Sequence, residues 1–101
     1  MTDPDLQTKL QHFLKQHSEW KMKSQPEMLY REYTLHDFGA AVNAIQKIAE
    51  VAETMDHHPD LHLTGYKHLK VELSTHQIKR ISLKDIALAG RIDELITTNK
   101  R

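Results

Sequence analysis

Two periodicities of hydrophobic and polar residues alternate along the chain. In three stretches apolar side chains recur every three or four residues, which predicts amphipathic helices. In four other stretches polar and apolar residues alternate, which is typical of half-buried strands. The predicted helices occupy residues 2–16, 34–55 and 82–96, and the predicted strands occupy residues 19–23, 28–34, 61–66 and 69–76.

The order helix, two strands, helix, two strands, helix predicts an α+β fold. The short turn at 24–27 makes the first two strands antiparallel neighbours. Amphipathic helices must bury their apolar faces, so we expect two layers: a four-stranded antiparallel sheet with three helices on one face. A length of 101 residues suits one domain, which spans residues 1–101.

The predicted second helix has the widest apolar surface. We expect Thr34 to cap it, with Asp37 as the acid of its first turn. A 4-3-4-3 spacing places one set of apolar residues on a single face: Phe38, Val42, Ile45, Ala49 and Ala52. Three further residues widen this stripe: Ile48, Val51 and Met55. The width suggests that the helix also packs against a partner.

Charge and composition exclude several function classes. Lys plus Arg and Asp plus Glu number 14 each, so no basic excess favours nucleic acid or a membrane surface. No apolar run approaches the ~20 residues of a membrane span, and the polar first 20 residues argue against a signal peptide. The lack of cysteine excludes disulfides and thiolate chemistry and favours a reducing compartment, the cytoplasm or the nucleus.

Eight histidines are the unusual feature of the composition. Two adjacent ones, His57 and His58, stand before Pro59, which disfavours helix at the preceding residue. They therefore lie where a helix ends, and a protonated imidazole is favoured at that end. His76 ends a later strand. Imidazoles exchange protons near neutral pH, so these three histidines are candidates for general acid–base chemistry.

The other histidines receive no functional role from their surroundings. We expect His12, His17, His62 and His68 to be solvated. One alternative is a metal site that uses His57, His58, His62 and His76. Pro59 argues against it, because it breaks the helix that would bring positions 58 and 62 together. We therefore expect no metal.

The histidines belong to a longer ordered motif that resembles the pterin-4a-carbinolamine dehydratase family. The motif reads Asp56, His57-His58-Pro59, Tyr66, Ser74-Thr75-His76 and Asp85. The similarity extends to Trp20, Tyr30-Arg31-Glu32-Tyr33, Asp37-Phe38 and Ile86-Ala87-Leu88-Ala89. Leu61 stands where many members carry Trp, and this version of the His-His-Pro motif is similar to that of plant-type members.

The resemblance implies an enzyme that dehydrates 4a-hydroxytetrahydropterin, such as 4a-hydroxytetrahydrobiopterin, to a quinonoid dihydropterin. This hydro-lyase reaction supports tetrahydrobiopterin recycling and requires no cofactor or metal. His57 and His76 would transfer protons, and His58 would chiefly bind substrate. The remaining pocket wall would come from Pro59, Thr75, Gln77 and Ile78.

Two carboxylates would support these imidazoles. Asp56 and Asp85 would orient them or raise their pKa values, and we expect Asp85 to hold His76. Ser82 and Asp85 also have the spacing of a capping box, so Asp85 has a purely structural reading as well.

The resemblance further implies a homodimer or homotetramer. It leaves a second hypothesis open, a protein-binding module that acts as a dimerisation cofactor or transcriptional coactivator. Its binding surface would be the 34–55 helix, but no residue pattern indicates a particular transcription-factor partner.

Overall fold

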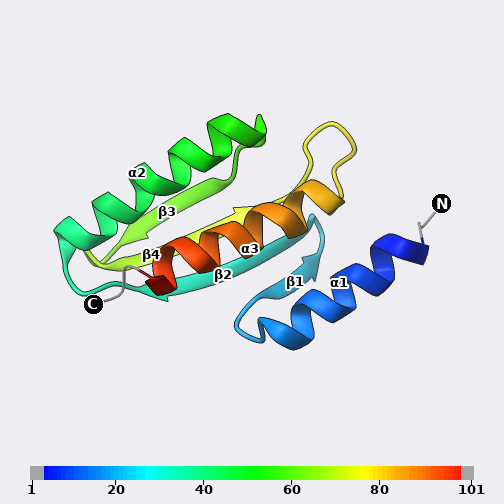
Figure 1. Cartoon of the computed structure of the whole chain (residues 1–101), viewed down its shortest axis with the longest axis horizontal. Coiled ribbons are helices and arrows are strands. Elements are labelled where there is room, and N and C mark those ends of the chain that lie inside the picture. Colours follow the sequence, from blue (N-terminus) through cyan, green and yellow to red (C-terminus); the bar gives the residue numbers. More distant parts are fainter. Residues whose placement is uncertain (1–3, 99–101) are drawn as a thin grey trace.

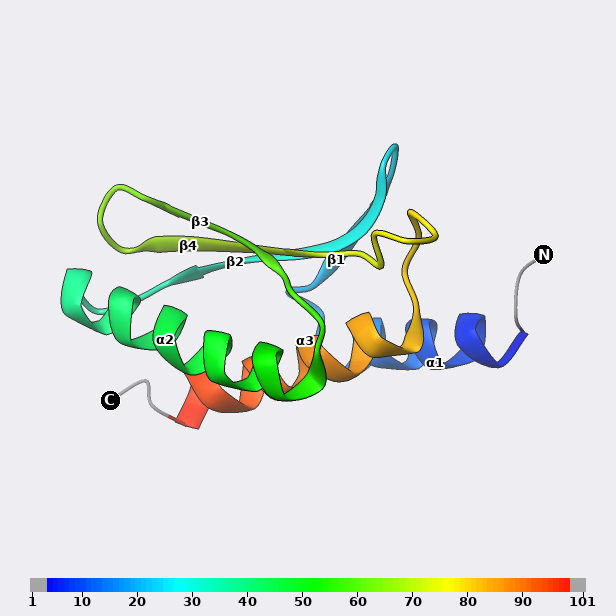
Figure 2. The ribbon, with the colours of Figure 1, turned by 90° about the horizontal axis from the view of Figure 1, so that it is seen from above.

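All three helices lie on one face of a single antiparallel sheet (Figure 1; Figure 2). The computed structural model describes residues 4–98. Its elements are α1 (Pro4–Gln16), β1 (Lys21–Ser24), β2 (Glu27–Thr34), α2 (Phe38–Met55), β3 (Asp60–Thr64), β4 (His68–Leu73) and α3 (Leu83–Thr98). The predicted α+β order is confirmed. The predicted start of the first helix, at residue 2, lies outside the described residues.

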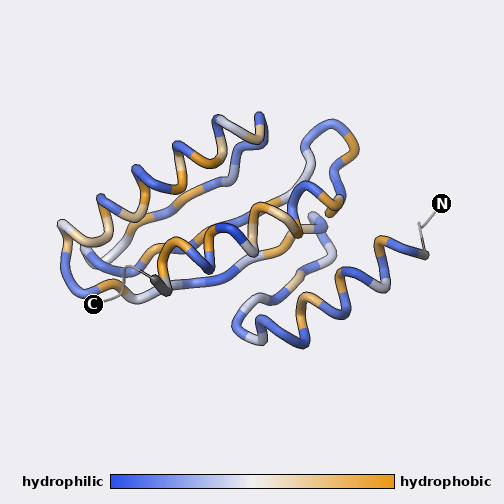
Figure 3. Tube along the Cα trace, viewed as in Figure 1, coloured by the Kyte–Doolittle hydropathy of each residue, from blue (hydrophilic) through white to orange (hydrophobic). Residues whose placement is uncertain are grey.

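The sheet order is β1-β2-β4-β3, so the central strands are β2 and β4. In β4 the residues Leu69, Val71 and Leu73 are buried and alternate with more exposed ones. Apolar and polar segments likewise alternate along the helices (Figure 3). Ile48 of α2 and Leu88 of α3 are fully buried and belong to the same core. No helix within residues 4–98 is long and apolar enough to cross a membrane.

The first strand differs from its prediction. It begins at Lys21, and all four of its residues are exposed, Met22 included. Figure 2 shows the β1–β2 hairpin bending away from the helices, so no helix covers its tip. Trp20 lies just before the strand and is buried, with its ring 6.5 Å from the ring of Tyr33.

The face that α2 buries was predicted only in part. Its buried residues are Ala41, Ala44, Ile48 and Ala52. Ile48 and Ala52 belong to the predicted stripe, whereas Ala41 and Ala44 do not, and Phe38 of that stripe is 56% exposed. The cap is Asp37, whose carboxylate accepts the Ala40 N–H at 2.8 Å, while Thr34 belongs to β2.

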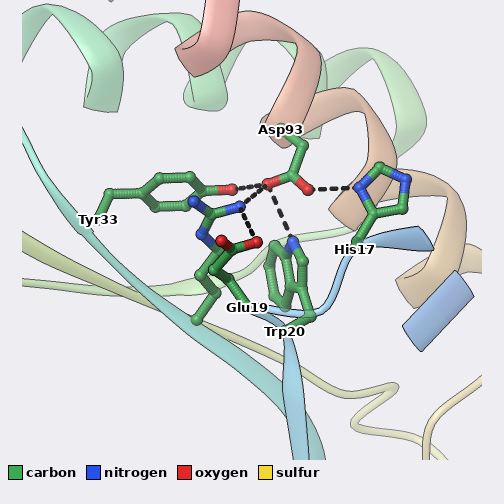
Figure 4. Close-up of polar contacts among 6 residues, drawn as sticks. His17, Glu19, Trp20, Tyr33 and Asp93 are labelled. Carbon is green, nitrogen blue, oxygen red and sulfur yellow. Dashed lines mark hydrogen bonds and ion pairs between the residues drawn. The ribbon is translucent and has the colours of Figure 1, made fainter. Parts of the chain in front are cut away.

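A buried carboxylate on α3 joins three parts of the fold (Figure 4). Asp93 Oδ1 accepts the Trp20 Nε1–H and an Arg31 Nη1–H, each at 3.0 Å, and the Tyr33 hydroxyl. Asp93 Oδ2 lies 2.6 Å from His17 Nδ1, so His17 is not simply solvated as expected. Burial, reinforced by Asp93, raises the pKa of Tyr33 far above its usual value of 10.0, so the phenol remains a neutral donor.

Candidate functional site

The predicted histidines meet at one end of the molecule, where three segments converge. Here α2 ends, β4 passes into the loop before α3, and α3 begins (Figure 1; Figure 2). A cavity of about 250 Å³ lies between them. Its lining residues are Asp56, His57, His58, Ser74, Thr75, His76, Gln77 and Lys84.

Asp56 turns the chain at the end of α2 and so aims the two histidines. Its backbone is left-handed (φ 52°, ψ 45°), and its N–H bonds to the carbonyls of Ala52 and Glu53. The His57 N–H also bonds to the Ala52 carbonyl, at 3.0 Å. Asp tolerates this conformation better than most residues. After the turn His57 is buried, only 8% exposed, whereas His58 is exposed.

Asp85 anchors His57 from inside the protein. It is fully buried, and its Oδ1 lies 2.5 Å from His57 Nε2. Its Oδ2 accepts the Thr75 hydroxyl and the Ser82 N–H, each at 2.8 Å. An ionised carboxylate can only accept hydrogen bonds, so Nε2 carries the hydrogen. Nδ1 of His57 is then the nitrogen left to exchange a proton.

The expectation that Asp85 holds His76 is therefore wrong. After the left-handed turn at Asp56, His57 lies inward against Asp85, while His76 is exposed, lines the cavity and makes no hydrogen bond to Asp85. Asp85 does reach back to the Ser82 N–H, as in a capping box. It does not line the cavity itself and contacts the site through His57.

A second carboxylate–imidazole pair lies on the surface. His58 Nε2 is 2.7 Å from Glu53 Oε2, and both side chains are mostly exposed. Such pairs contribute little to stability. The carboxylate of Asp56 hydrogen-bonds to no imidazole among residues 4–98, so its expected orienting role is wrong; Asp85 and Glu53 are the carboxylates that do so.

His76 reaches the cavity from a tight loop. The Thr75 N–H bonds to the Arg80 carbonyl at 2.8 Å, which closes residues 76–79 into a projection. This loop presents His76 and Gln77 to the cavity, whereas Ile78 is 55% exposed and does not line it. Pro59 also lies outside the lining, so its structural effect is to end α2.

Sequence reasoning missed Lys84 and Glu53 at this site, and it named Ser74 in the motif without giving it a role. The sequence did contain a sign that Lys84 is functional. A cation in the first turn of a helix opposes the helix dipole, so its presence there calls for another reason. Glu53 lies one helical turn before His57, a spacing that also places side chains near each other.

The histidine metal site has no geometric support in the described chain. Within residues 4–98 no three His, Asp or Glu side chains are grouped as a metal site requires. His57 and His58 face different carboxylates. His62 lies on the open face of the sheet, with Nε2 2.8 Å from Glu72 Oε1.

The fold and the cavity together define a small α+β domain with a histidine-lined site for a polar ligand. Comparison with known families assigns the domain more narrowly. Residues 2–95 match the family described as pterin 4 alpha carbinolamine dehydratase, and the chain belongs to that family.

Individual relatives agree with this assignment. A Halorhodospira halophila protein named for the family is 35% identical over 85 residues, covering 84% of this chain and 77% of that protein. Pterin-4-alpha-carbinolamine dehydratase 2, mitochondrial, of Arabidopsis thaliana is 39% identical over 67 residues, covering 66% of this chain and 36% of that longer protein.

Solved structures share the fold. The transcriptional coactivator/pterin dehydratase from Brucella melitensis superposes with a TM-score of 0.78 at 26% identity, over 85% of this chain and 90% of that one. A pterin dehydratase-like RuBisCO assembly factor of the alpha-carboxysome superposes with a TM-score of 0.65 at 20% identity, over 78% of this chain and 90% of that one.

Proposed function

We propose that the protein is a hydro-lyase that dehydrates 4a-hydroxytetrahydropterin, with 4a-hydroxytetrahydrobiopterin as the substrate whose dehydration supports tetrahydrobiopterin recycling. One observation carries the proposal beyond family membership. His57 and His76 come from different elements and line the same cavity, and a buried carboxylate fixes one of them.

The two imidazoles supply the two proton transfers that the reaction needs. A protonated imidazole donates to the C4a hydroxyl, the C4a–O bond breaks and water leaves. A neutral imidazole accepts the N5 proton, and the electron pair of that N–H bond forms the N5=C4a double bond. The two imidazoles thereby exchange protonation states, and exchange with solvent restores them. General acid–base catalysis of this kind contributes ~10²–10⁴-fold.

The anchored histidine is suited to repeated proton transfer. With Nε2–H donated to Asp85, His57 keeps one orientation and one tautomer, and its Nδ1 alternates between the two states. His76 is exposed and can exchange protons with solvent. His58, Thr75 and Gln77 complete the wall and bind the substrate by hydrogen bonds.

A dehydration assay tests the proposal. 4a-Hydroxytetrahydropterin is generated chemically, and its conversion to the quinonoid product is followed by absorbance with and without protein. We expect the wild type to accelerate the reaction, and His57→Ala and His76→Ala each to lower kcat by ~10²-fold or more. His12→Ala, which removes an exposed histidine of α1, is the matched control. A wild-type rate equal to that of buffer would overturn the proposal.

A second candidate function is protein binding through α2. Its support is the exposed Phe38 on the outer flank of that helix and the coactivator description of the Brucella protein. Phe38→Glu would abolish capture of such a partner while dehydration by the same variant continues. Loss of dehydration with partner capture intact would contradict this surface.

A further inference from the structure

Two charged side chains at the cavity stand at unfavourable ends of their helices. Asp56 caps the C-terminus of α2, the negative end of that helix, and Lys84 lies in the first turn of α3, the positive end. The helix dipole favours the opposite arrangement at both places. Uncharged Gly or Asn usually occupies a left-handed C-terminal cap. The cap therefore accounts for the backbone conformation of Asp56 but not for its negative charge.

Neither charge is neutralised within the described chain. Among residues 4–98, Asp56 and Lys84 form no salt bridge, either with each other or with another residue. Both nevertheless line the same cavity. The cavity thus keeps a carboxylate and an ammonium group that are available to a ligand.

These two groups differ from the other lining residues in having a fixed hydrogen-bonding polarity. An ionised carboxylate only accepts and an ammonium only donates, whereas the Gln77 amide and the Ser74 hydroxyl do both. Imidazoles change roles as they exchange protons. Asp56 and Lys84 are therefore the lining residues that can distinguish a donor from an acceptor on the ligand.

We propose that Asp56 and Lys84 determine specificity by reading the pyrimidinone edge of the pterin. This edge presents the 2-amino group and N3–H as adjacent donors, followed by O4 as an acceptor. The Asp56 carboxylate accepts the two N–H groups side by side, and the Lys84 ammonium donates to O4. The inference rests on the proposed function and deepens it.

The arrangement selects 2-amino-4-oxopteridines against 2,4-dioxopteridines. In lumazine, a 2,4-dioxopteridine, an oxygen replaces the 2-amino group. That oxygen would face the Asp56 carboxylate, acceptor against acceptor. O4 is the same in both compounds, so Lys84 would not distinguish them.

Binding of pterin and lumazine to variants of the full chain tests both roles. We expect the wild type to prefer pterin. Asp56→Asn should lose about ten- to hundredfold in pterin affinity and most of the preference, because an amide can also donate to the C2 oxygen. Lys84→Gln should weaken both ligands by a similar factor and keep the preference. Glu50→Gln and Lys79→Gln remove exposed charges outside the cavity and should leave both affinities unchanged.

Thermal melting separates recognition from a structural role. Each charge opposes its helix dipole, so Asp56→Asn and Lys84→Gln should melt no lower than the wild type. A lowered melting temperature with unchanged affinities would assign both residues to the fold and overturn the inference. Equal wild-type affinities for pterin and lumazine, alongside dehydration activity, would overturn it and leave the proposed function standing. A wild type that neither binds pterin nor dehydrates the carbinolamine would overturn both.

Discussion

The Asp85 carboxylate divides two tasks between its two oxygens. Oδ2 accepts the Ser82 N–H at the start of α3 and the Thr75 hydroxyl, while Oδ1 holds His57. The same side chain therefore secures a helix terminus and fixes the tautomer of His57, a candidate for proton transfer. Asp85 is fully buried, so water cannot replace a lost hydrogen bond. A substitution that removes one of its acceptor oxygens therefore affects either the helix start or His57.

Replacing Asp85 with Asn separates these tasks. The amide has one oxygen and one NH₂ group, so it either loses an acceptor at the helix start or presents a donor to His57 Nε2. A donor at that place favours the opposite tautomer. We expect kcat to fall by ~10²-fold or more and the melting temperature to fall as well. Steady-state kinetics and melting measure the two effects.

Ser82→Ala is the control for that substitution. It keeps the Ser82 N–H that Asp85 accepts, and it removes a hydroxyl that lies 2.5 Å from the Thr75 hydroxyl and 3.4 Å from Asp85 Oδ2. It should retain kcat. A wild-type kcat in Asp85→Asn, with only a lowered melting temperature, would reduce Asp85 to a helix cap.

His58 is expected to bind substrate rather than to transfer protons. Its side chain is exposed and paired only with exposed Glu53, so nothing fixes its tautomer as Asp85 fixes that of His57. His58→Ala should raise KM more than it lowers kcat, the signature of a group that binds ground state and transition state alike. The opposite pattern, an unchanged KM with a collapsed kcat, would make His58 a chemical participant.

The sequence predicted which side chains meet at the site but not how they pair. His57, His58 and His76 could be selected because a proline and two element boundaries place them at segment ends. The partner of Asp85 could not be selected, since it depends on the direction that the chain takes at the left-handed Asp56. The direction in which the chain leaves α2 is set by the backbone conformation of the helix cap. The spacing of residues in the sequence does not reveal that conformation.

At the scale of elements, periodicity predicted the seven helices and strands in order because each has one buried face. It identified only part of the buried face of α2, where apolar residues cover a wide arc. Ile48 and Ala52 are buried as predicted, but so are Ala41 and Ala44, which the predicted stripe did not include. The contacts of Asp93 with His17, Trp20, Arg31 and Tyr33 were not predictable (Figure 4). These residues come from the connection between α1 and β1, from β2 and from α3, and only the packing of the whole chain brings them together.

Asp93 gives α3 a polar attachment to β2 and to the segment before β1, in addition to its apolar contacts in the core. Asp93→Ala should lower the free energy of unfolding by about 3 kcal/mol, because it leaves Arg31, a largely buried charge, with only the exposed carboxylate of Glu19 at 3.9 Å. Urea unfolding measures the change. Glu94→Ala, which removes a neighbouring exposed carboxylate, should change stability little. A similarly small effect of Asp93→Ala would show that the cluster is not a stabilising one.

The open face of β4 carries a pH-dependent contribution to stability. Burial acts to raise the pKa of Glu72, but the hydrogen bond and charge of His62, with Lys23 and Lys70, outweigh it and hold the pKa below 4.5. A carboxyl whose pKa is lowered by folding stabilises the fold above its unfolded pKa, and that contribution disappears as pH falls through the folded value.

Glu72→Gln should therefore flatten the loss of stability on acidification between about pH 5 and pH 3. Urea midpoints measured across this range for the wild type and the variant give the comparison. Glu32→Gln, on the same face of the sheet, should retain the wild-type profile. Parallel acid profiles for Glu72→Gln and the wild type would contradict the assignment.

At the scale of the whole molecule, the outer flank of α2 leaves apolar surface uncovered. Phe38 is 56% exposed, and Val42, Ile45 and Ala49 follow it at helical spacing without being fully buried. A chain of 11.8 kDa has a small core, so covering this flank with a second copy would add stability. Closed two-fold symmetry is the usual arrangement for such contacts.

We therefore expect a homodimer or a tetramer built from two dimers, with α2 flanks in contact. Light scattering should give a mass two or four times that of the chain. Phe38→Glu should lower that mass, because the new charge would be desolvated in the interface, and it should cost the single chain little, because the side chain is already exposed. Met22→Gln changes an exposed apolar residue of β1 and should leave the mass unchanged. If the wild type has the mass of one chain at every concentration, the flank of α2 is not a contact between copies, and its exposed phenylalanine would have to serve a different partner.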